Sequence, residues 1–123
     1  MKLTNNEIYI YARNLIEAFN DGEQKLPIKI SFYLQKNKNT LMQLAQDIET
    51  SRLEIAKNYG ILDEENQQYN IPTDKMEDAQ KELTDLFNLE QDVQIYTINI
   101  DNFGDDLTIT TAQMEAIMFM IEQ

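Results

Sequence analysis

The sequence predicts an α+β fold that is mainly helical, with an antiparallel hairpin of long helices, a small β-sheet and short terminal helices. Apolar residues recur at helical spacing over residues 5–20, 27–59 and 73–89. Residues 93–100 are instead rich in β-branched and aromatic side chains, which is typical of a strand. The 123 residues contain no repeat and no Pro-rich linker, so we expect a single domain, 1–123.

The first helix is marked at both ends. Thr4 and Glu7 have the spacing of a capping box, in which each side chain bonds the other residue's backbone amide. Asp21-Gly22 supplies a stop, because glycine readily adopts the left-handed conformation that follows many helices. We therefore expect a helix over residues 5–20.

The next segment admits two interpretations. Residues 28–34 alternate apolar and polar side chains, as in a half-buried strand. The same apolar positions also begin a helical stripe, and residues 36–39 contain no Gly or Pro to interrupt it. We predict one long helix from Pro27 to Tyr59, ended by Gly60. The alternative is a strand over 28–34 and a helix from Thr40.

The region after Gly60 combines a loop and a third helix. Residues 63–69 are polar and acidic and predict a loop, and residues 69–71 predict a short strand. Asp74 and Glu77 form another potential capping box. We expect the third helix over residues 73–89.

The C-terminal region should contain the main strand and the last helix. Residues 93–100 are the strongest strand candidate. A turn follows, and residues 107–109 could form a brief strand. A capping box at Thr110 and Gln113 predicts a helix over residues 111–121.

Several kinds of chemistry are missing. The chain has no histidine and no cysteine, which excludes nucleophile–histidine pairs, zinc sites of the usual Cys/His type and disulfides. Its three glycines are far apart, so there is no phosphate-binding glycine loop. The aspartates at 101, 105 and 106 do not match a calcium loop, because Phe103 stands at a ligand position. We expect no catalytic residue, no metal and no cofactor.

Charge is the most informative property of the chain. It has 22 acidic and 10 basic residues, and after Lys81 nine carboxylates follow without a cation. Residues 24–46 are the local exception, with four lysines and no carboxylate. An acidic surface attracts basic partners and disfavours direct binding to nucleic acid, which requires Lys and Arg to neutralise phosphates.

The last helix is apolar on nearly all sides, so it is either buried or presents a face to a partner. Self-association as a homodimer would use Met114, Ile117, Met118 and Ile121.

No apolar run approaches the ~20 residues of a membrane span, and the N-terminus lacks an apolar signal core. We expect a cytoplasmic protein that does not contact a membrane.

Several segments together resemble a family of small acidic proteins encoded by phages and prophages of Gram-positive bacteria. The likeness covers most of the chain. It is carried by 26–34 (LPIKISFYL), 58–60 (NYG), 69–72 (YNIP), 81–83 (KEL), 93–95 (VQI) and 114–121 (MEAIMFMI). The resemblance implies an intracellular protein made during infection and supports a helix over 28–34. It implies no activity and no functional residues.

These observations lead to one main hypothesis and two alternatives. The main hypothesis is a non-enzymatic, phage-encoded inhibitor that binds the basic groove of a host defence or replication protein. The expected partner-binding residues are Glu82, Asp85, Glu90, Asp92, Asp101, Asp105 and Asp106. The alternatives are a structural or assembly protein of the phage particle, and an enzyme that uses carboxylates with Mg²⁺.

Overall fold

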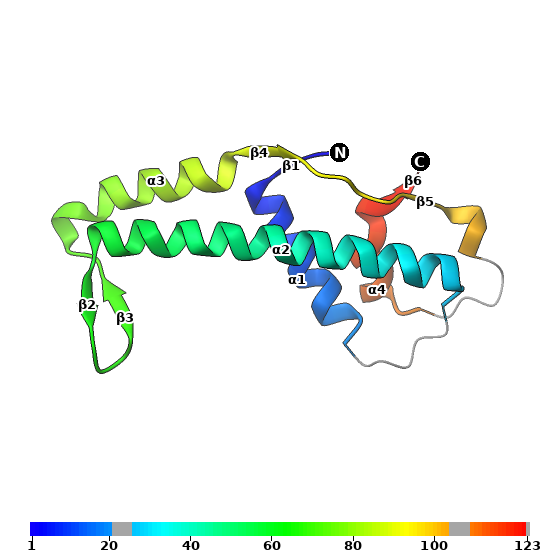
Figure 1. Ribbon diagram of the computed structural model, residues 1–123, viewed down its shortest axis with the longest axis horizontal. Helices are drawn as coiled ribbons and strands as arrows, with labels where there is room; N and C mark the ends of the chain where they lie inside the picture. Colours follow the sequence, from blue (N-terminus) through cyan, green and yellow to red (C-terminus); the bar gives the residue numbers. More distant parts are fainter. Residues whose placement is uncertain (21–25, 104–108, 123) are drawn as a thin grey trace.

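One helix, α2 (Ile28–Tyr59), runs most of the length of the molecule in the computed structural model (Figure 1). The structure describes residues 1–20, 26–103 and 109–122. Ile30 and Leu34 are buried while Phe32 is exposed, which is helical and not alternating burial. The predicted long helix is therefore confirmed, and the alternative strand over 28–34 is excluded.

The other elements are short. In chain order they are β1 (Lys2–Thr4), α1 (Asn5–Ala18), β2 (Ile61–Asp63), β3 (Gln68–Asn70), the 3₁₀ turn η1 (Thr73–Lys75), α3 (Met76–Asn88), β4 (Glu90–Asp92), β5 (Ile98–Asn99), the 3₁₀ turn η2 (Ile100–Phe103), α4 (Thr111–Ile117), the 3₁₀ turn η3 (Met118–Met120) and β6 (Ile121–Glu122).

Helix α1 begins as the sequence predicts. The Thr4 hydroxyl accepts a hydrogen bond from the Glu7 amide at 3.1 Å, and the Glu7 carboxylate accepts one from the Thr4 amide at 3.0 Å. The helix ends at Ala18, two residues earlier than expected. The predicted stop at Asp21-Gly22 lies outside the described residues.

Helix α3 returns along the C-terminal half of α2 and forms the predicted helical hairpin, with the β2–β3 ribbon at the turn (Figure 1). The segment 63–69, expected as a loop, is partly paired, because Asp63 and Gln68 are partners in this ribbon. Helix α3 is preceded by η1 and capped at Lys75 without a side-chain bond. The predicted capping box of Asp74 and Glu77 is therefore wrong.

Among the described residues, the strands form three separate two-stranded sheets in place of one. Strand β1 pairs with β4 and β2 with β3, both antiparallel, and β5 pairs with β6 in parallel. The predicted strand over 93–100 is wrong for most of its length, since only Ile98 and Asn99 belong to a strand. Instead, the backbone of Val93 bonds to Met1, and that of Tyr96 bonds to the Asn37 side chain.

The C-terminal helix forms the predicted capping box, in which the Thr110 hydroxyl accepts from the Gln113 amide at 3.1 Å. It ends at Ile117, not at Ile121, because the chain tightens into η3 and then enters β6. Of the possible strand over 107–109, Ile109 is in no strand, and the rest lies outside the described residues.

The core joins α1, α4 and the N-terminal half of α2. Burial of apolar side chains is the main stabilising contribution there, at about 25 cal/mol per Å². The most deeply buried large side chains are Ile8, Leu15, Ile30, Leu41, Ile98, Met120 and the polar Asn37.

Candidate partner-binding site

The folded chain gathers most of its negative charge in one part, residues 47–92, which we call the acidic arm. The arm comprises the C-terminal part of α2, the β2–β3 ribbon, η1, α3 and β4, and extends to one side of α1 (Figure 1). It carries thirteen carboxylates against four cations, which is −9 of the chain's −12. The carboxylates are Asp47, Glu49, Glu54, Asp63, Glu64, Glu65, Asp74, Glu77, Asp78, Glu82, Asp85, Glu90 and Asp92.

Helix α3 packs its apolar residues against the rest of the protein and exposes its acidic residues. Ala79 is buried, and Leu83 and Leu86 are half-buried on the same side of the helix. Glu82 and Asp85 are exposed, Glu82 at the edge of this apolar face and Asp85 farther round the helix. Because each residue advances the helix by about 100°, packing of the apolar face orients these carboxylates toward solvent.

A groove of about 380 Å³ lies between α2 and α3 within the arm. Its lining combines carboxylates with apolar side chains, and comprises Glu54, Ile55, Asn58, Glu82, Asp85, Leu86 and Leu89. Desolvation of the nearby Tyr59 hydroxyl, and next the charge of Glu82, raise the pKa of that phenol. The groove suits a Lys or Arg side chain, whose stem packs on apolar surface while its cation meets carboxylates.

A hydrogen-bonded triad anchors the arm to α1. Glu49 accepts hydrogen bonds from the Tyr9 hydroxyl and from Arg52, whose Nε and Nη2 lie 2.9 and 2.5 Å from its two oxygens. The Arg52 hydrogen bond, then that of Tyr9, lowers the pKa of Glu49 to about 2. Because these intramolecular hydrogen bonds occupy its carboxylate, we assign Glu49 a structural role.

Four of the seven predicted partner-binding residues lie in the acidic arm. Glu82 and Asp85 line the groove, and Glu90 and Asp92 follow on β4. Strand β1 partly neutralises β4, because Lys2 lies 3.8 Å from Glu90 and opposite Asp92 in register.

The other three predicted residues do not join this group. Asp101 is exposed in η2, at the opposite end of the molecule from α3 (Figure 1). Asp105 and Asp106 lie outside the described residues.

Sequence reasoning missed the part of the arm that precedes Lys81. Counting charge along the chain grouped the residues after Lys81 and left out Glu54, which folding places beside Glu82 and Asp85. The sequence did contain a signal for this proximity. In the predicted helical hairpin, the end of one helix faces the start of the next, so acidic residues on both helices can be neighbours.

The residues expected to mediate self-association are mostly packed inside the protein. Ile117 is only 3% exposed, and Met114 and Ile121 are partly buried against the core. Met118 is 50% exposed. The proposed apolar face therefore does not exist as a continuous surface, because its central residue belongs to the core.

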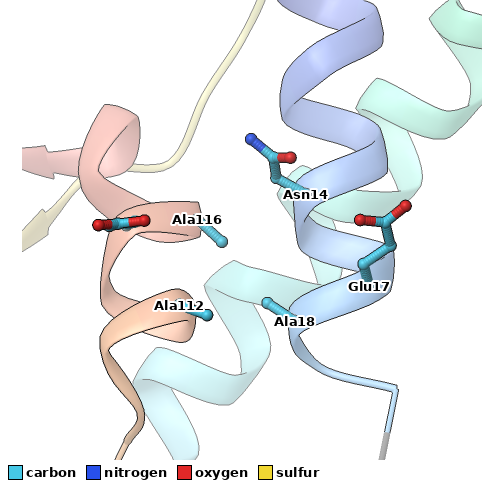
Figure 2. A pocket seen from close by; sticks show the side chains of 6 residues that line it. Asn14, Glu17, Ala18, Ala112 and Ala116 are labelled. Atoms are coloured by element: carbon cyan, nitrogen blue, oxygen red, sulfur yellow. The ribbon is translucent and has the colours of Figure 1, made fainter.

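A second groove lies between α1 and α4, with a volume of about 250 Å³ (Figure 2). Ala18 of α1 and Ala112 and Ala116 of α4 line it, while Asn14 and Glu17 project from α1. The only charged groups of this lining are the exposed carboxylates of Glu17 and Glu115, so we assign no chemistry to it.

Neither a carboxylate metal site nor a membrane-spanning helix occurs in the part of the chain that the structure describes. No three carboxylates come close enough there to hold a metal ion. None of its helices combines the length and apolar character of a membrane span.

No family model, curated protein or solved structure matches the chain. The functional assignment therefore depends on the charges and geometry described above.

Proposed function

We propose that the protein is a non-enzymatic interaction protein whose acidic arm binds the basic groove of a host nucleic-acid-binding protein and thereby inhibits it. The resemblance to phage proteins makes a bacterial defence or replication protein, in the host cytoplasm, the expected target. The observation that carries the proposal is the concentration of a net −9 charge in the arm.

The arm has properties that a phosphate mimic needs. Eleven of its thirteen carboxylates are exposed. Six of these eleven stand on α2 or α3. The backbone bonds of these helices are internally satisfied, so the spacing of the six does not depend on the partner. Attraction between such a surface and a basic groove accelerates encounter and weakens as salt rises.

The groove between α2 and α3 adds specificity to this attraction. Glu54, Glu82 and Asp85 can each accept hydrogen bonds from a guanidinium or ammonium group. Leu89 is 58% exposed and offers the apolar surface that desolvates the contact. A nucleic acid lacks this aliphatic surface, so the protein would compete through charge and packing together.

A charge-reversal experiment tests the proposal. The immobilised protein is used to capture partners from a lysate of infected host cells at low and high salt, and the captured protein is then purified. The E54K/E82K/D85K variant should lose binding by at least about 100-fold, which corresponds to about 1 kcal/mol per contact. A captured target should also release bound nucleic acid when the wild-type protein is added.

A matched control separates local from overall charge. The E17K/D101K/E115K variant changes the net charge by the same amount at exposed residues outside the arm, and it should retain most of the binding. Equal loss in both triple variants, or no loss in the arm variant, would refute the proposed site. A target whose nucleic acid stays bound would refute inhibition by competition.

An assembly role in the phage particle is the second candidate. Exposed apolar residues along α2, among them Ile28 and Phe32, favour this role because particle proteins bind one another repeatedly. Mass spectrometry of purified particles decides between the roles, since an inhibitor of a host protein need not be packaged.

A further inference from the structure

One face of α2 exposes large apolar side chains at four positions between residues 28 and 53. They are Ile28, Phe32, Met42 and Leu53, which we call the α2 strip, and Ile28 is 85% exposed. With 3.6 residues per turn, these positions lie on one side of the helix. The buried Ile30, Leu34, Leu41 and Ile48 lie on the other side. Phe32, Met42 and Leu53 are 53%, 42% and 46% exposed, so each leaves a large part of its side chain uncovered.

An apolar groove of about 390 Å³ opens beside the middle of the α2 strip. Ile16 of α1, which is exposed, and Met42 and Ala45 of α2 contribute to its lining. The remaining lining residues are Tyr9, Ala12, Arg13, Glu17 and Gln46. The uncovered apolar surface is thus widest near the midpoint of α2.

Charge is separated along one flank of the same helix. Lys29 and Lys36 stand in its N-terminal half, and Asp47 and Glu54 stand on the same flank in its C-terminal half. The two ammonium groups lie over aromatic rings, 5.7 Å from the centre of Tyr33 for Lys29 and 5.4 Å from that of Phe32 for Lys36. These rings hold the cations beside the α2 strip.

We propose that the α2 strip binds a second copy of this chain, with the two α2 helices antiparallel about a two-fold axis between Leu41 and Met42. Residues 29 and 54 lie equally far from this point in the sequence, as do residues 36 and 47. Each lysine of one copy would therefore face a carboxylate of the other, and Ile28 would lie near the other copy's Leu53. A parallel pair would place lysines against lysines and acids against acids, which is unfavourable.

The contact would be of modest size. Helix α2 is about 48 Å long at 1.5 Å per residue, and a strip ~10 Å wide along it covers roughly 500 Å² per copy. A standard interface buries about 800 Å² per partner, so the dimer should be weak and should dissociate on dilution. Because Glu54 also lines the groove of the acidic arm, dimerisation and partner binding should compete.

Sedimentation velocity over a range of protein concentrations tests the proposal without any knowledge of the partner. The wild-type protein should form a dimer that weakens as salt rises. The M42E variant, and separately K29E/K36E, should raise the dissociation constant by at least about tenfold. Combining K29E/K36E with D47K/E54K should restore dimerisation, because the pairs are reversed but complementary.

The control variant K75E/K81E makes the same change in net charge at exposed residues of η1 and α3, and should leave dimerisation unchanged. A protein that stays monomeric at about 1 mM, where a dimer would be stabilised by less than about 4 kcal/mol, would overturn the proposal. So would a dimer that tolerates M42E and K29E/K36E, or one disrupted only by M118E. Failure to bind a host target would leave this result unaffected, so the two proposals fail separately.

Discussion

The carboxamide of Asn37, in the N-terminal half of α2, bonds both backbone groups of Tyr96. Asn37 Nδ2 donates to the Tyr96 carbonyl at 2.9 Å, and Asn37 Oδ1 accepts from the Tyr96 amide at 2.8 Å. One side chain thus makes the pair of hydrogen bonds that a neighbouring strand would make. It attaches Tyr96 to the helix and satisfies both backbone groups of this residue without a neighbouring strand.

Replacing Asn37 with leucine should therefore destabilise the fold although the helix keeps an apolar residue of similar size. Two backbone groups of Tyr96 lose their partners, and we expect a loss of about 2–4 kcal/mol in the free energy of unfolding. Chemical denaturation followed by circular dichroism measures it. The exposed neighbour Asn39 provides a control, since N39A should change stability by less than about 0.5 kcal/mol. Equal midpoints for N37L and wild type would show that the paired bonds contribute nothing.

The Glu49 triad predicts a specific dependence of stability on pH. The hydrogen bond from Arg52, then that from Tyr9, lowers the folded-state pKa of Glu49 to about 2, below the ordinary value of 4.5. The stabilisation is therefore complete above the unfolded-state pKa and is lost as the pH falls from about 4.5 through about 2.

The E49Q variant removes this titration. Relative to wild type, E49Q should be less stable at pH 6, and the difference should shrink as the pH falls toward 2. Urea denaturation at several pH values measures both curves. The exposed Glu54 offers a control, because E54Q leaves the triad intact. A difference between E49Q and wild type that stays constant over this range would contradict the linkage.

Ile117 and Met118 are adjacent, but replacement by glutamate should destabilise the protein strongly at Ile117 and little at Met118. I117E places a carboxylate in the core, where Ile117 is 3% exposed. We expect it to cost at least about 4 kcal/mol or to prevent folding, because a buried charge without a partner is strongly unfavourable. M118E alters an exposed residue and should change the thermal midpoint little. Equal thermal midpoints of I117E and M118E would contradict the burial of Ile117 and the exposure of Met118.

Gly60 is required by the close approach of α2 and the β2–β3 ribbon. A Cβ atom there would lie 2.6 Å from the Ala56 carbonyl oxygen and 2.9 Å from the Tyr69 Cβ. Since one of these atoms is backbone, G60A should force the ribbon away and destabilise the protein by about 1–3 kcal/mol. S51A, at an exposed position of the same helix, serves as control. Wild-type stability of G60A would mean that the junction has more room than its geometry indicates.

Local patterns in the sequence determined the helices. The apolar stripe over residues 27–59 specified α2, and the capping boxes at Thr4 and Thr110 specified where α1 and α4 begin. These features depend on residues within one or two turns of each other, so one-dimensional spacing contains them. The lack of His and Cys likewise excluded whole classes of chemistry before any contact was known.

Contacts between distant residues decided the rest. Within the strand-like segment 93–100, the backbone of Tyr96 bonds to Asn37, 59 positions away, in place of a neighbouring strand. The charge division at Lys81 in the sequence differs from the charge distribution in space, because the helical hairpin places Glu54 beside Glu82 and Asp85. Hydrogen-bond partners and electrostatic fields depend on distance in space, and a linear sequence does not state which separated residues will be neighbours.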